Sequence, residues 1–217
     1  MDNQAGARQP YRIVTPPSAA TMACKRAFDI LCSLLGLVVL SPVLLVVSVL
    51  VAVTSPGGVF FRQERIGKDG RPFHIFKFRS MRKDNAGLKI TTGNDSRITP
   101  VGRFLRKSKI DELPQLINVL VGDMSFVGPR PEVADYVNLY TPYQRQVLLV
   151  RPGITGLASI RFRNENDLLT ASDDPNRTYV EQIMPRKIDL DLEYIPHASV
   201  FYDIKLIFQT FAVVIKE

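Results

Sequence analysis

The chain has 217 residues, of which 46% are hydrophobic, and its 28 Lys and Arg against 21 Asp and Glu give a net charge of +7. This charge favours anionic partners such as phosphates, nucleotides, acidic lipids or nucleic acid, and it does not choose among them. The only two cysteines, Cys24 and Cys32, lie in or beside an apolar segment, which argues against a disulfide framework or a zinc site and indicates a reducing compartment.

Residues 1–21 are polar and contain prolines, which predicts a flexible N-terminal tail. The apolar segment that follows carries no charged side chain from position 30 to position 54. It is long enough to cross a hydrocarbon core of about 30 Å as one helix. Because Lys and Arg flank it on both sides, their cytoplasmic preference favours neither orientation.

A proline interrupts the middle of this apolar segment. Pro42 cannot donate to the carbonyl of Val38, which costs about 3 kcal/mol in a straight helix, and the hydroxyl of Ser41 can satisfy that carbonyl instead. We therefore predict a re-entrant membrane helix over residues 22–55, broken at Ser41-Pro42, with both chain termini on the cytoplasmic face. A kinked helix that spans the membrane is the alternative, because proline is common in such helices.

Two strands are expected next. Residues 59–66 and 73–79 are joined by residues 67–70, whose Asp-Gly step is a strong signal for an antiparallel β-hairpin. Period-two alternation places Lys77 and Arg79 on one face. This face is either solvated or presents two cations that grip a diphosphate.

Two helices follow a turn-rich segment. Thr99-Pro100 is typical of an N-cap and first helical position, and the short basic helix that it begins carries Arg106. Apolar residues at helical spacing predict a second helix directly after it: Leu113, Leu116, Ile117 and Leu120. Asp111 and Glu112 are then expected at the N-terminal end of that second helix.

An adjacent carboxylate pair at a helix N-terminus has a chemical use. The helix end stabilises the ionised carboxylates, which can hold Mg²⁺, and an ionised Asp can attack phosphorus as a covalent nucleophile. Ordinary capping is the alternative, because Ser108 with Asp111 resembles a capping box. The downstream loop, in which Pro129 and Pro131 flank Arg130, favours the chemical interpretation.

Several long segments resemble the bacterial sugar transferases, and more specifically the small monotopic polyprenyl-phosphate phosphoglycosyl transferases. The resemblance runs from about Lys25 to the C-terminus and rests on KRAFDI (25–30), FFRQERIGKDGRPFHIFKFRSMR (60–82), DELPQLINVLVGDMSFVGPRP (111–131) and RPGITGLASI (151–160). It implies transfer of a sugar 1-phosphate from a UDP-sugar to undecaprenyl phosphate, with release of UMP. It also implies a covalent phosphosugar intermediate on Asp111, with Mg²⁺ at Asp111 and Glu112, and Glu112 binding the metal or activating the acceptor.

By the same motif matching, a set of substrate-binding candidates is expected to contact phosphate and nucleotide: Lys77, Arg79, Arg106, Pro129, Arg130 and Arg163. Arg163-Asn164 replaces a Gly-Arg-Asn turn of many relatives, so the sequence does not name the sugar. The expected partners are a UDP-sugar, undecaprenyl phosphate and inner-membrane lipid, with no nucleic acid. Monomer and homodimer both remain open.

The C-terminal segment has a helical apolar face formed by Phe201, Ile204, Phe208, Phe211 and Ile215. We expect this face to lie in the membrane interface and bring the catalytic pair to the level of the lipid phosphates. The Asp189-Leu190-Asp191 segment matches a metal signature of other glycosyltransferases, and we interpret Asp189 as surface acidity.

The sequence thus predicts a mixed α/β, mostly helical fold: a tail over 1–21, the re-entrant helix over 22–55, and a catalytic domain over 56–217. The enzyme is expected on the cytoplasmic face of the bacterial inner membrane. Two alternatives stay open, a membrane-tethered basic binding module and a Mg²⁺-dependent UDP-sugar diphosphate hydrolase. The glycoconjugate pathway is not determined by the sequence.

Overall fold

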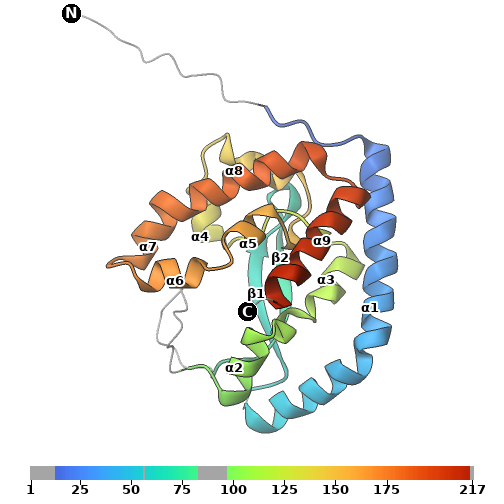
Figure 1. The fold of residues 1–217 in the computed structure, drawn as a ribbon, viewed down its shortest axis with the longest axis vertical. Coiled ribbons are helices and arrows are strands. Elements are labelled where there is room, and N and C mark those ends of the chain that lie inside the picture. The colour runs from blue at the N-terminus through green and yellow to red at the C-terminus, as the bar shows by residue number, and fades with distance from the viewer. Residues whose placement is uncertain (1–12, 56, 83–96, 216–217) are drawn as a thin grey trace, which may run out of the picture.

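A computed structural model of the chain describes residues 13–55, 57–82 and 97–215. Most of these residues are helical, and two small sheets lie among the helices, which confirms the mixed α/β, mostly helical part of the predicted fold (Figure 1). The predicted tail, residues 1–21, lies outside the described residues up to position 12, and its last residues belong to the first helix. The helices and strands are α1 (Ala19–Thr54), β1 (Phe60–Ile66), β2 (Pro72–Phe78), α2 (Pro100–Lys107), α3 (Gln115–Val121), β3 (Ser125–Val127), α4 (Ala134–Val137), β4 (Gly153–Thr155), α5 (Leu157–Arg161), α6 (Glu165–Thr170), α7 (Pro175–Thr178), α8 (Met184–Tyr194) and α9 (Val200–Ile215).

The long apolar helix α1 bends but does not break. Ser18 caps its start by accepting a hydrogen bond from the backbone N–H of Thr21, and the helix continues through Pro42. The hydroxyl of Ser41 donates to the carbonyl of Val38 at 2.8 Å, as predicted, and so satisfies the group that Pro42 cannot reach. Figure 1 shows that the helix changes direction along its length, so the structure gives a bend in place of the predicted interruption.

Both arms of α1, the residues before Pro42 and those after it, pack against the rest of the protein. In the first arm, Lys25 and Asp29 are buried beside β3 and α9, and in the second arm Val47 and Val51 join a core cluster with residues of β2 and α2. The helix is long and apolar enough to cross a membrane by length and composition, and only 11% of its most apolar window is buried. The exposed apolar residues run from Ile30 to Val53, on the side of α1 that faces away from the rest of the protein.

A buried polar network fixes the first arm of α1. The ammonium of Lys25 donates to the Ser125 hydroxyl at 2.6 Å, to the Val127 carbonyl at 3.0 Å and to the carboxylate of Asp203. The hydroxyl of Tyr194 donates to the second oxygen of Asp203 at 2.6 Å. The network connects α1, β3, α8 and α9, so the orientation of the apolar helix is set by hydrogen bonds as well as by packing.

Removing Lys25 is expected to destabilise this junction. Lys25→Ala leaves Asp203 buried without its cation, and breaking a buried ion pair from one side costs about 3–5 kcal/mol of unfolding free energy. Lys205→Ala, at an exposed position on α9, is the matched control and should change the stability little. Chemical unfolding in detergent measures both, and equal stability of the two variants would contradict the structural role of Lys25.

The predicted β-hairpin is confirmed. Strand β1 pairs antiparallel with β2, and the turn places Asp69 and Gly70 at φ 58° and 73°, in the region that an Asp-Gly step tolerates. On the outer edge of β2, the side-chain amide of Asn118 accepts from the N–H of Phe76 at 3.0 Å and donates to the carbonyl of His74 at 2.8 Å. Because Asn118 belongs to α3, this amide fixes the hairpin against the helix that follows the predicted catalytic pair.

The face of α9 predicted to be apolar is exposed. Phe201, Phe208 and Phe211 are 87%, 70% and 59% exposed, whereas Asp203 and Leu206 on the opposite side are buried. The side chain of Ile215, also assigned to this face, lies outside the described residues. Core packing therefore does not explain the phenylalanines, and contact with the membrane interface stays a prediction.

Candidate active site

The predicted catalytic pair lies in a short 3-10 turn, Ile110–Glu112, between α2 and α3. Lys109 precedes it with φ 58°, in the left-handed region, and ends the preceding helical segment. The prediction that the pair belongs to the first turn of the next helix is wrong, since that helix begins at Gln115. Pro114 has no N–H to donate to the carbonyl four residues earlier, so α-helical bonding cannot extend back to the pair.

Asp111 is buried without a full set of partners. Asp111 is 7% exposed, and its Oδ1 accepts no hydrogen bond. The alternative of a capping box is not formed, because Lys109 occupies the capping position of this turn without a side-chain cap, and the hydroxyl of Ser108 donates to the carbonyl of Phe104 at 2.8 Å. Burial, with the negative charge of Glu112, raises the pKa of Asp111 above its usual value. Unpaired buried acceptors are rare in proteins and are often found at functional sites.

Glu112 lies in the opposite electrostatic environment. Its Oε1 accepts from the ammonium of Lys77 at 2.7 Å and from the guanidinium of Arg130 at 3.4 Å. Burial alone would raise the pKa of Glu112, but the two cations outweigh it and hold the pKa well below its usual range. The two neighbouring carboxylates thus differ: Glu112 is a fixed anion that positions two cations, and Asp111 keeps an oxygen for another group.

The structure brings together some of the predicted cations and separates others. Lys77 and Arg130 meet at Glu112, and the positive charge of Arg106 acts on Asp111. The guanidinium of Arg79 lies against Gly57 in the turn after α1, where a Cβ would be 1.9 Å from its Nη1. Arg163 is exposed between α5 and α6, and no contact among the described residues joins it to the catalytic pair. Its predicted role in substrate binding therefore remains a prediction.

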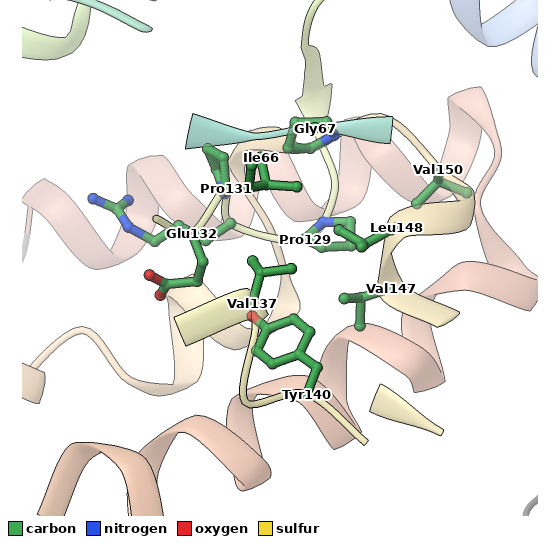
Figure 2. A pocket seen from close by; sticks show the side chains of 12 residues that line it. Ile66, Gly67, Pro129, Pro131, Glu132, Val137, Tyr140, Val147, Leu148 and Val150 are labelled. Atoms are coloured by element: carbon green, nitrogen blue, oxygen red, sulfur yellow. The ribbon is translucent and has the colours of Figure 1, made fainter. Parts of the chain in front are cut away.

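The loop that carries Arg130 is held on both sides. The carbonyl of Pro129 accepts from the N–H of Gly153 at 2.9 Å, and a Cβ at Gly128 would lie 2.5 Å from the carbonyl oxygen of Arg151, which only glycine permits. Figure 2 shows Pro129 and Pro131 near aliphatic side chains from the hairpin, from α4 and from the segment 147–150. The cavity between them measures about 10 Å³, the size of one water. This close packing gives the Arg130 loop a defined conformation.

One important residue of this region was missed by the sequence analysis. Asp191 is 5% exposed and accepts backbone hydrogen bonds from Arg130 and Ala158, so it supports the Arg130 loop. The interpretation of Asp189 as surface acidity is confirmed, because Asp189 is exposed. The helical spacing of the buried residues of α8 would have placed Asp191 inside: Met184, Lys187, Ile188, Asp191 and Leu192.

Further polar contacts join the Arg130 loop to the neighbouring elements. The guanidinium of Arg65 donates to the carbonyl of Pro131 at 3.2 Å and pairs with Glu132 at 3.5 Å. The hydroxyl of Tyr179 donates to the same Glu132. The ammonium of Lys187 pairs with Glu165 at 2.8 Å and lies 5.2 Å from the ring centroid of Tyr179. These contacts tie the hairpin, the arginine loop and helices α6 to α8 into one network.

The titration of Asp191 gives a prediction for stability. Burial raises the pKa of Asp191 to about 8, above the value of about 3.9 in an unfolded chain. The folded state therefore binds the proton more tightly, and the contribution of Asp191 to stability falls as the pH rises from about 4 to 8. Asp191→Asn removes this titration, so its unfolding temperature should fall less across that range. Thermal unfolding of both proteins at several pH values measures it, and parallel curves would contradict the assignment.

Comparisons with known proteins show which proteins this chain is similar to. Residues 20–217 match the family described as bacterial sugar transferase. The chain is 43% identical over 202 residues to the UDP-glucose:undecaprenyl-phosphate glucose-1-phosphate transferase of Escherichia coli (strain K12), covering 90% of this chain and 41% of that protein. It is 38% identical over 199 residues to the UDP-N-acetylgalactosamine-undecaprenyl-phosphate N-acetylgalactosaminephosphotransferase of Aeromonas hydrophila, covering 89% and 44%.

A relative of similar length completes the comparison. The exopolysaccharide production protein PSS of Rhizobium leguminosarum bv. phaseoli is 41% identical over 199 residues, covering 87% of this chain and 94% of that protein. The chain thus spans about two fifths of the length of the Escherichia coli relative and nearly all of the Rhizobium one. A carboxylate pair beside two cations, an apolar helix long enough to cross a membrane, and relatives named as transferases together indicate a membrane-associated transferase. The chain belongs to the bacterial sugar transferase family.

Proposed function

We propose that this protein is a phosphoglycosyl transferase that moves a sugar 1-phosphate from a UDP-sugar to undecaprenyl phosphate and releases UMP. The observation that carries the proposal is the contrast between the two carboxylates. Asp111 has a buried oxygen without a partner, while Glu112 holds Lys77 and Arg130 beside it. The names of the relatives support the same donor and acceptor classes.

The proposed reaction has two steps at one carboxylate. An oxygen of Asp111 attacks the sugar-bearing phosphorus, a new O–P bond forms, and the P–O bond to UMP breaks. An oxygen of undecaprenyl phosphate then attacks the same phosphorus, which releases the phosphosugar to the lipid and restores the carboxylate. Lys77 and Arg130 are placed to neutralise charge on the diphosphate in the first step, which is the main requirement of phosphoryl transfer.

Mg²⁺ fits this site through Asp111. Mg²⁺ is commonly held by one or two carboxylates together with substrate phosphates, and the unpartnered Oδ1 of Asp111 suits that role. Both cations use Oε1 of Glu112, so its second oxygen is a further candidate ligand. The described residues contain no group of three or more His, Cys, Asp or Glu able to hold a metal, so the remaining ligands would come from the donor. When bound, the ion neutralises the diphosphate and its leaving group.

The proposed location is the cytoplasmic face of the bacterial inner membrane, with α1 re-entrant and both termini cytoplasmic. The contact of both arms of α1 with one domain supports this arrangement, because a spanning helix would carry one end away to the opposite face. The exposed phenylalanines of α9 support contact with lipid at the interface. Cysteine labelling at positions 20 and 60 in sealed vesicles tests it, and accessibility from opposite faces would refute it.

The experiment that tests the function is UMP release from a panel of UDP-sugars that includes UDP-glucose and UDP-N-acetylgalactosamine, with Mg²⁺, with and without undecaprenyl phosphate. We expect one or a few donors to give UMP together with lipid-linked sugar phosphate. Free sugar phosphate with no lipid product would indicate the diphosphate hydrolase. A protein that turns over no donor and binds nucleic acid with steep salt dependence would indicate the basic binding module.

A further inference from the structure

The β-hairpin has two faces with different surroundings. In an antiparallel pair, residues directly opposite each other point to the same side, and Phe61 lies opposite Lys77. Lys77 reaches Glu112 at 2.7 Å, so its face of the hairpin is the catalytic face. Phe61 therefore belongs to the catalytic face, next to the cation that is expected to bind the diphosphate.

The same face continues along β1 toward the arginine loop. Gln63 and Arg65 follow Phe61 at alternate positions, and the amide oxygen of Gln63 accepts from the guanidinium of Arg65 at 2.9 Å. Arg65 in turn donates to the carbonyl of Pro131. Phe61 is thus the outer member of a row of side chains that runs from the edge of the site to the loop that holds Arg130.

The ring of Phe61 differs from the aromatic rings on the opposite face. There, Phe60 stacks on Phe78 with centroids 5.6 Å apart, and Arg62 lies 5.0 Å from the ring centroid of Phe76. Phe61 is 45% exposed, and no aromatic or cation–π partner for it occurs among the described residues. A half-exposed ring with an uncovered surface beside a phosphate-binding cation is suited to stack on a nucleobase.

We infer that Phe61 forms the nucleobase subsite of the active site and stacks on the uracil ring of the UDP-sugar. This inference rests on the proposed function, because it assigns a position to the base of the same donor. The diphosphate at Lys77 connects through ribose to the base, so the base must lie within one nucleoside of Lys77. The ring of Phe61 is the exposed aromatic surface directly across the strand pair from that cation.

The test compares Phe61→Leu with Phe60→Leu in detergent, since the two residues are adjacent, similarly exposed and on opposite faces of the hairpin. Binding is measured with UMP and with ribose 5-phosphate, which lacks the base. We expect Phe61→Leu to weaken UMP binding about 5- to 150-fold, the range for loss of one stacked base. Ribose 5-phosphate should bind equally to native protein and variant, and Phe60→Leu should bind UMP within about 2-fold. Phe61→Tyr should restore UMP binding.

Each other outcome has a definite meaning. Unchanged UMP binding in Phe61→Leu, or equal loss of UMP and ribose 5-phosphate, would overturn the subsite. A defect confined to the KM for undecaprenyl phosphate would assign Phe61 to the lipid instead and would also overturn it. If the native protein transfers sugar phosphate in any of these cases, the proposed function stands without the subsite. If the native protein neither binds UMP nor turns over any UDP-sugar, both proposals fail.

Discussion

Asp111→Asn is expected to abolish the first half of the reaction. The amide has the shape of the carboxylate but is a far weaker nucleophile, so UMP release should fall by at least about 10³-fold. The sharpest measurement is exchange of labelled UMP into the UDP-sugar without any lipid acceptor. This exchange needs an intermediate that keeps the phosphosugar on the protein, and the native enzyme should also gain the mass of one phosphosugar under these conditions.

Asp189→Asn is the matched control for this experiment. Asp189 is exposed on α8, so its amide variant should exchange UMP at the native rate. Full exchange in Asp111→Asn would leave Asp111 with a structural role and refute the covalent mechanism. Loss of exchange with normal transfer to the lipid would indicate direct attack of the acceptor on the donor.

The hairpin was predictable because its determinants are local. The Asp-Gly turn and the alternation of β1 and β2 fix both strands and their register, and the register alone places Lys77 on a defined face. The pairing of Lys77 with Glu112 was not predictable in the same way. It spans 35 positions of sequence and depends on how α3 packs against β2 through Asn118.

The conformation around the catalytic pair shows where periodicity misleads. The apolar spacing after Asp111 is helical, but Pro114 interrupts the bonding and moves the pair into a separate 3-10 turn. Asp191 is the opposite case, because helical spacing was the signal that could have found it. Asp191 shares one face of α8 with Ile188 and Leu192, and contacts with distant segments bury that face. The hydrogen bond from Ser41 to Val38 was predictable, because the Ser41 hydroxyl and Pro42 act within one turn of the apolar helix.

The second large loss of activity is expected when Arg130 is replaced. Its guanidinium pairs with Glu112 and is held at the site by a packed loop, so the positive charge is already in place when the diphosphate binds. Arg130→Met should lower kcat/KM by about 10²–10³-fold, as for removal of one preorganised donor. Arg130→Lys keeps the charge but loses the planar fork, so we expect an intermediate loss of about 10- to 100-fold.

A control at Arg186 separates this effect from a general loss of positive charge. Arg186 is exposed on α8, and Arg186→Met should keep kcat/KM within about 2-fold. Thermal unfolding should show that Arg130→Met still folds, since Lys77 continues to pair with Glu112. If Arg130→Met kept kcat/KM within about 5-fold of the native value, well short of the expected loss, Lys77 alone would account for the positive charge at the site. The role of the arginine loop would then be to shape the site through its two prolines.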